Sequence, residues 1–320
     1  MKMRVPAYNL RPIGSVRSLA RALGVSPSEL EKLASQASKH YFPNAPQEKP
    51  SGGLRQTYRV SDRLKKVQDR ILAQILRRVE FPPYLFAVNA DDYPRDYIAD
   101  AYLHAGAQTL ICVDIKDYFP SIRGEFVQRV WQHFFDFPPP VAEVLTDLSL
   151  YNDYLPQGAS TSSHLAVLLL FEVEPRLELS LREQGFHYSR YIDDIYVSAW
   201  RACSSDEKEQ VLSSLIGMMY RYKLSPNRKK IEIGKPSSRM RVHNLNVGSG
   251  RPTKPKEERS RIRAAVKNCE EMALISRATE EYRGQWRKTQ GRVLEMSILH
   301  PGEAGPLLVR LDAIPPALHT

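Results

Sequence analysis

The sequence predicts an α+β protein with a mixed or antiparallel sheet. Two short apolar runs have the composition of strands, TLICVDI at 109–115 and YIDDIYVSA at 191–199. Longer segments around them read as helices, and strands and helices do not alternate in a regular βαβ rhythm. The chain has 320 residues, which is enough for two or three subdomains that each bury a core.

The first half of the chain is expected to contain two helical stretches. Ser26 and Glu29 form an S-x-x-E capping signature, and prolines at 43, 46 and 50 then interrupt the pattern, so residues 1–50 are predicted to be a helical N-terminal extension. The strand-like run SGGLRQTYRV follows. An amphipathic helix with one basic face is expected over 64–79, before prolines at 82 and 83.

The second half continues the mixture of helices and strands. Strand-like segments are KKIEIG at 229–234 and VHNLNVG at 242–248, and the chain from residue 253 onward is basic and helical. Helices are expected over 125–135, 141–150, 165–181 and 206–222.

Charge and cysteine usage narrow the class of protein. The net charge of +10 favours a polyanionic partner, with nucleic acid ahead of an anionic membrane surface, and simple solubility is the alternative explanation of the charge. Cys112, Cys203 and Cys269 form no C-x-x-C pair, which disfavours a structural zinc site or a disulfide framework. The N-terminus lacks the apolar core of a signal peptide, and the most apolar run, 165–171, is too short to span a bilayer. We therefore expect a cytoplasmic protein without a membrane partner.

Acidic residues inside the two apolar runs are the candidate chemical site. Burying Asp193 and Asp194 costs several kcal/mol unless cations or donors compensate, and a strand would send the two side chains to opposite faces unless they lie in a hairpin turn. Such a pair alone is common in surface turns. Asp114, at the end of the other apolar run, strengthens the case, because an acid on one strand and two on a neighbouring hairpin can hold two divalent ions.

Three ordered motifs carry a family resemblance. YIDD at 191–194 resembles the Y-x-D-D box of reverse transcriptases, and VDIKDYFPSI at 113–122 resembles their first carboxylate motif in its bacterial retron form. LPQG at 155–158 looks like their third motif, about 40 residues after the first acid and about 35 before the acidic pair. The resemblance implies a right-hand polymerase fold, with fingers at 51–110, a palm with an inserted fingers segment at 111–250 and a helical thumb at 251–320.

The resemblance also implies roles at the acidic site. Asp114 and Asp193 would be the principal ligands of two Mg²⁺ ions, Asp194 would be their companion, and the carbonyl of Ile115 would face a metal. One ion would lower the pKa of a primer hydroxyl, and the other would neutralise charge on the triphosphate and on the leaving pyrophosphate. Lys230 lies near the family lysine that protonates pyrophosphate, although Lys229 is an equal candidate from sequence and a solvated charge is the alternative role.

Nucleotide-binding roles follow in the same way. Phe119 falls where the family keeps an aromatic steric gate against a 2′-hydroxyl, and Gln157 and Gly158 would contact the incoming nucleotide, although ordinary packing is the alternative for each. Arg55 matches the fingers arginine that grips the triphosphate. Other nearby basic residues are alternatives to it: Arg59, Arg63, Lys65 and Lys66.

The C-terminal segment is expected to contact a nucleic-acid backbone. Tyr282 and Trp286 in it could stack on bases or simply pack. The basic side chains that we expect to track phosphates, with a solvated face as the alternative, are Arg261, Arg263, Lys267, Arg287 and Lys288, in a stretch that also holds Arg259 and Arg292.

Two retron elements match only in part. In the N-A-x-x-H element, Ala101 and His104 match but Asp100 replaces asparagine, and His104 taken alone reads as a packed histidine. In the V-T-G element Val242 is kept, while His243 and Asn244 replace the other two residues. These departures leave open a divergent retron enzyme or another bacterial antiviral reverse transcriptase.

The resemblance implies an RNA-directed DNA polymerase that uses dNTPs and makes complementary DNA from a dedicated noncoding RNA. About 70 residues follow VHNLNVG, which suits a thumb but not a nuclease domain, so a separate effector protein in phage defence is expected. The alternatives are an RNA-binding scaffold that holds a defence effector, and a template-independent or protein-primed DNA synthesiser.

Overall fold

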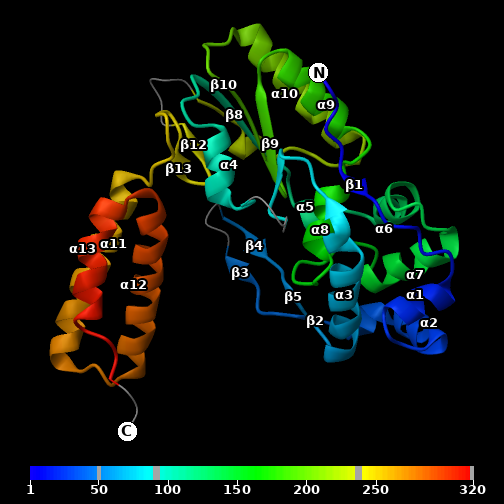
Figure 1. Cartoon of the computed structure of the whole chain (residues 1–320), viewed down its shortest axis with the longest axis horizontal. Helices are drawn as coiled ribbons and strands as arrows, with labels where there is room; N and C mark the ends of the chain where they lie inside the picture. Colours follow the sequence, from blue (N-terminus) through cyan, green and yellow to red (C-terminus); the bar gives the residue numbers. More distant parts are fainter. Residues whose placement is uncertain (49–51, 89–93, 235–239, 318–320) are drawn as a thin grey trace.

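The computed structural model describes the chain except for residues 49–51, 89–93, 235–239 and 318–320, so the proline at 50 lies outside the described residues. Its centre is a five-stranded sheet in the order β11-β8-β10-β9-β7, antiparallel except for the β7–β9 pair (Figure 1). The fold is therefore α+β with a mixed sheet, as the sequence predicts. The strands of this sheet are β7 Leu85–Phe86, β8 Thr109–Asp114, β9 His187–Tyr191, β10 Asp194–Ala199 and β11 Glu232–Gly234.

The N-terminal helices share a hydrophobic core with the sheet. Leu19 and Leu30 belong to the same buried cluster as Val113 and Ile195. The Ser26 hydroxyl accepts the Glu29 N–H at 3.2 Å, so the predicted cap is present. The elements here are α1 Val16–Ala22, α2 Pro27–Ser35 and the 3₁₀ turn η1 Ala37–His40, with the strand pairs β1 Ala7–Tyr8 and β6 Val79–Glu80, β2 Tyr41–Pro43 and β5 Tyr58–Val60, and β3 Gln47–Glu48 and β4 Leu54–Arg55.

Two predicted helices are shorter than expected. The helix expected over 64–79 is α3 Asp62–Gln74, followed by the 3₁₀ turn η2 Leu76–Arg78, because Val79 pairs with β1 in a strand. The single helix expected over 165–181 is wrong: α8 Ser162–Leu168 and α9 Glu174–Glu183 are separate helices. Pro175 opens α9, where its ring and missing N–H do not let an earlier helix continue.

The remaining helices of the main body lie around the sheet (Figure 1). The expected helices near 125–135, 141–150 and 206–222 are present, the first one ending in a π-helical turn. These elements are α4 Tyr97–Leu103, α5 Tyr118–Ser121, α6 Gly124–Arg129, η3 Val130–Phe134, α7 Pro139–Ser149, α10 Ser205–Tyr220 and the 3₁₀ turn η4 Arg228–Lys230.

The C-terminal helices form a separate bundle with its own core, and α12 is the one nearest the rest of the molecule (Figure 1). A short hairpin, β12 Arg241–Val242 and β13 Leu245–Asn246, precedes them, so the strand-like VHNLNVG contains a turn. The three helices are α11 Lys256–Ile275, α12 Glu280–Leu299 and α13 Pro301–Asp312. Among the described residues, no helix has the length and apolarity needed to cross a membrane.

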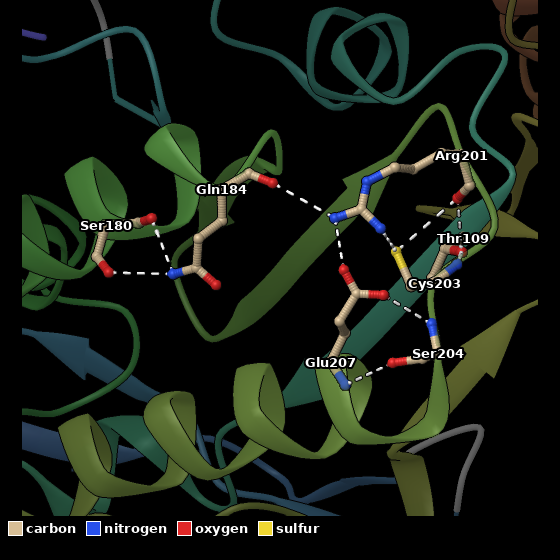
Figure 2. Close-up of polar contacts among 7 residues, drawn as sticks. All are labelled: Thr109, Ser180, Gln184, Arg201, Cys203, Ser204 and Glu207. Carbon is tan, nitrogen blue, oxygen red and sulfur yellow. Dashed lines mark hydrogen bonds and ion pairs between the residues drawn. The ribbon is translucent and has the colours of Figure 1, made fainter.

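Polar contacts fix β8 and β10 at the end of the sheet away from the acids (Figure 2). Arg201 pairs with Glu207 of α10 at 2.7 Å, and Glu207 closes a capping box with Ser204. The Cys203 N–H donates to the Thr109 hydroxyl at the start of β8, at 3.1 Å. These contacts hold the register of the two strands, and a slip by one residue would turn every side chain to the other face.

Candidate active site

The three acids of the predicted site meet at one end of the central sheet. Asp194 begins β10 and pairs in register with Asp114 at the end of β8. Asp193 lies in the two-residue turn between β9 and β10, where Ile192 adopts a left-handed backbone with φ +58°. The N–H of Ile115 donates to the carbonyl of Asp193 at 2.9 Å, which ties the turn to β8. This is the hairpin that the sequence predicts.

The site concentrates negative charge. Burial, and then the charges of Asp194 and Asp114, raise the pKa of the Asp193 carboxyl to about 6. Burial also raises the pKa of Asp194, with Asp114 adding to the effect against the charge of His243. Neighbouring carboxylates that resist joint ionisation are stabilised by a cation placed among them.

Asp114 already has two partners in the structure. Asn227 Nδ2 donates to Asp114 Oδ1, and Lys230 Nζ donates to Asp114 Oδ2, both at 2.9 Å. Burial lowers the pKa of Lys230, but the hydrogen bond and charge of Asp114 outweigh this and leave the pKa raised. Both Lys229 and Lys230 are exposed, and the hydrogen bond to Asp114 comes from Lys230. Asn227 was not among the residues predicted from sequence, where its only signal is its place just before these lysines.

Arg190 contacts the turn that holds Asp193, and it too was not predicted from sequence. Its fully buried guanidinium pairs with Glu174 at 2.6 and 2.7 Å and donates to the Ile192 carbonyl at 2.9 Å. A further bond runs to the carbonyl of Val167 at 2.6 Å. A cation directly before the apolar run at 191–199 is the signal that could have identified it, since buried arginines are almost always paired.

The LPQG loop is fastened to β5. The Tyr58 N–H donates to the Gln157 carbonyl at 2.8 Å, and Gln157 is half-buried. Gly158 has φ +111°, and a Cβ there would lie 2.4 Å from the Tyr58 carbonyl oxygen. Glycine is therefore required by the approach of a protein strand. Contact of Gln157 and Gly158 with a nucleotide stays a prediction.

The structure places two other predicted nucleotide contacts, and within the described residues no hydrogen bond joins either of them to the acids. Phe119 lies in α5, half-buried, with its ring 6.2 Å from that of Tyr118. Arg55 is exposed on β4. The carbonyl of Ile115 as a metal ligand, Phe119 as a steric gate and Arg55 as a triphosphate ligand all stay predictions.

The basic residues of the C-terminal bundle fall into two groups. Arg261, Arg263 and Lys267 on α11 lie near Glu258, Glu303 and Glu271, at 3.6, 3.0 and 3.8 Å. Arg287 and Lys288 on α12 are exposed. Tyr282 and Trp286 are packing residues, because Tyr282 is fully buried and the Trp286 indole donates to the Leu311 carbonyl at 3.1 Å.

A pocket of about 780 Å³ adjoins the acids. It lies against the β12–β13 hairpin and combines carboxylates, cations and aromatic rings. Its lining includes Tyr97, Asp114, Tyr191, Asp194, Lys230, Arg241 and His243.

The donor set fits a divalent cation that also binds a substrate. Within the described part of the chain, no group of three or more His, Cys, Asp or Glu side chains is arranged as a complete metal site. Magnesium, however, usually takes one or two carboxylates and completes its shell with water and substrate phosphates. Asp193 and Asp194 carry no ion pair in the described structure, and the side chain of Lys230 on Asp114 is 43% exposed, so it is free to move away.

Comparison with known proteins agrees with this site. Residues 47–256 match the family described as reverse transcriptase (RNA-dependent DNA polymerase). The chain belongs to this family and is an RNA-directed DNA polymerase with the polymerase fold of reverse transcriptases. Members of the family generally use divalent metal ions.

Curated relatives define the type more closely. The chain is 34% identical to the Retron Se72 reverse transcriptase of Salmonella heidelberg (strain 579083-10), over 98% of this chain and 83% of the relative. It is 30% identical to the Retron Ec48 reverse transcriptase of Escherichia coli, over 95% and 77%. It is therefore a retron-type reverse transcriptase, despite its departures from the N-A-x-x-H and V-T-G elements.

Proposed function

We propose that this enzyme copies a dedicated noncoding RNA into complementary DNA by two-magnesium nucleotidyl transfer, in a retron-like anti-phage system. The observation that supports the chemistry is the pairing of Asp114 with Asp194 across β8 and β10, with Asp193 in the adjoining turn. The similarity to retron reverse transcriptases supports the RNA template, because these enzymes copy RNA into DNA.

In this proposal the acids hold the metal and Lys230 supplies a proton. Asp114 and Asp193 bind Mg²⁺, with Asp194 and the Ile115 carbonyl as further ligands. Bound magnesium would supply an activated primer hydroxyl and charge compensation for the triphosphate. Lys230, protonated beside Asp114, leaves that carboxylate when the nucleotide enters and donates its proton to the departing pyrophosphate.

The remaining residues select and hold the substrates. Arg55 grips the triphosphate, Gln157 and Gly158 contact the nucleotide, and Phe119 excludes a 2′-hydroxyl. In this assignment 1–50 is the N-terminal extension, 51–110 the fingers, 111–250 the palm and 251–320 the thumb. Thumb contacts to phosphates would come from Arg261, Arg263, Lys267, Arg287 and Lys288, all of them exposed, the first three on α11 and the last two on α12.

The proposal is tested by isolating the protein from its host and sequencing the RNA and DNA bound to it. We expect one structured RNA, encoded beside the gene, and DNA complementary to part of it. A mixture of cellular RNAs without complementary DNA would contradict the dedicated template. Homopolymer DNA, or DNA linked to a tyrosine, would instead favour a template-independent or protein-primed synthesiser. Phage challenge of cells with Asp193→Asn tests whether defence needs the DNA, and retained defence would favour the scaffold alternative.

Lys230→Gln is expected to lower the rate of DNA synthesis by about 10²-fold, the usual contribution of a general acid. Lys229→Gln is the matched control, because Lys229 is its exposed neighbour and should leave the rate within about twofold. Single-nucleotide incorporation under saturating dNTP measures both. Equal losses in the two variants would assign the lysines to general attraction of the nucleic acid.

A further inference from the structure

A buried hydrogen bond joins α4 to the β12–β13 hairpin beside the acids. Asp100 on α4 is fully buried, and its Oδ2 lies 2.7 Å from Nε2 of His243. Burial acts to raise the pKa of Asp100, but its interactions with His104, whose Nε2 lies 3.6 Å from Asp100 Oδ1, and with His243 outweigh it and hold the pKa below its ordinary range. The carboxylate is therefore ionised, and a buried charge of this kind is stable only with its partner in place.

His243 is held from two directions. With Asn244 it forms the turn of the hairpin, at φ +49° and +65°, a two-residue turn of the type that needs left-handed backbone at both positions. The ring of His243 lies 4.6 Å from that of Tyr191 and 4.9 Å from that of Tyr196. The backbone N–H of His243 donates to the Tyr196 hydroxyl at 3.3 Å. The backbone thus fixes one end of the residue, and Asp100 fixes the other.

The two tyrosines belong to the strands that carry the acids. Tyr191 ends β9 just before the turn that holds Asp193, and Tyr196 lies two residues after Asp194 in β10. A ring wedged against both tyrosines limits movement of the whole hairpin. His243 and Asp194 also line the same pocket.

The pair explains both departures from the retron elements. Asp100 stands in place of asparagine in N-A-x-x-H, and His243 in place of threonine in V-T-G. Without the His243 imidazole, an ionised Asp100 would keep only the longer contact with His104, at 3.6 Å, so the two replacements support each other. Asn244, in place of glycine, is the residue other than glycine that best tolerates a left-handed backbone.

We propose that Asp100 and His243 are a coupled pair of positioning residues that holds the Tyr191–Tyr196 hairpin in place for nucleotide transfer. The proposal rests on the proposed catalytic role of Asp193 and Asp194. It predicts an effect on the chemical step and little effect on nucleotide binding, because the pocket beside the pair does not include Arg55, Phe119 or Gln157.

The test is a double-mutant cycle with Asp100→Asn, His243→Asn and the double variant, on an RNA template annealed to a DNA primer. Asparagine suits both sites, since it matches aspartate in shape and tolerates positive φ. Each single variant should lower kcat about tenfold, with the KM for dNTP within about twofold of wild type. The double variant should be no slower than His243→Asn, because a neutral amide then replaces the carboxylate that His243→Asn leaves without its hydrogen bond.

Tyr102→Ala is the matched control on α4, since Tyr102 is 50% exposed there and should leave kcat unchanged. Kinetics are measured below the melting temperature of every variant. If the losses of kcat in the two single variants multiply in the double variant, or if only the KM for dNTP changes, the proposal that the two residues act as a coupled pair is wrong. Asp193→Asn is run in parallel: if it stays active the proposed chemistry fails, whereas an inactive Asp193→Asn with an additive cycle removes only this inference.

Discussion

Asp193→Asn is expected to abolish DNA synthesis and to stabilise the folded protein at the same time. The loss of activity should be about 10³-fold or more, because a carboxylate that organises charge in the transition state is removed. The gain in stability has a separate cause. Burial and the charges of Asp194 and Asp114 raise the pKa of Asp193 to about 6, so ionisation of this group opposes folding.

The sign of the pH dependence follows from that shift. The folded state holds the proton of Asp193 more tightly than the unfolded chain, so wild-type stability falls as the pH rises from about 4 to about 6. Asparagine cannot ionise, and after allowance for solvent screening the variant should gain about 1–2 kcal/mol above pH 6.

Thermal unfolding across pH in the presence of a chelator measures the gain, and primer extension measures the loss. Asp206→Asn is the control, because Asp206 is an exposed aspartate at the start of α10 and should change neither quantity appreciably. An Asp193→Asn enzyme that extends primers at the wild-type rate would refute the role given to the acids. Unchanged stability above pH 6 would refute the electrostatic account of the site.

The parts of the site that sequence predicts are those with a local pattern. The apolar run before Asp114 and the hairpin around Asp193 each lie within ten residues of sequence, so the strands, the turn and the acids can be predicted from local composition. Their convergence could be expected only because the resemblance supplied the order of strands. The helix expected over 165–181 failed because its run is buried on all sides and has no period to show where it ends.

The parts that sequence did not predict are contacts between distant residues. Asn227 and Asp114 are 113 positions apart, and His243 and Asp100 are 143 apart. A neutral amide or a histidine carries no local sign of such a partner. His104 is the partial exception, because it reads as a packed residue and is one, with its two ring nitrogens 2.7 and 2.8 Å from the Ser198 and Ser189 hydroxyls.

Arg190→Met is expected to destabilise the protein by about 3–5 kcal/mol, because it leaves the carboxylate of Glu174 buried without its partner. It also removes the donor from the Ile192 carbonyl in the acidic turn. Equilibrium unfolding in urea measures the first effect. Arg129→Met is the matched control, since Arg129 pairs with Glu172 at the surface and its loss should cost at most about 1 kcal/mol.

Adding Glu174→Gln to Arg190→Met separates the two roles of the arginine. Glutamine is neutral and still accepts from Tyr188, whose hydroxyl lies 2.6 Å from Glu174 Oε1, so most of the lost stability should return. The Ile192 carbonyl would still lack its donor. We therefore expect the folded double variant to remain at least about tenfold slower than wild type in primer extension. Full recovery of the rate would show that Arg190 supports the core alone, while a slow but stable enzyme would show that a buried cation shapes the turn that presents Asp193.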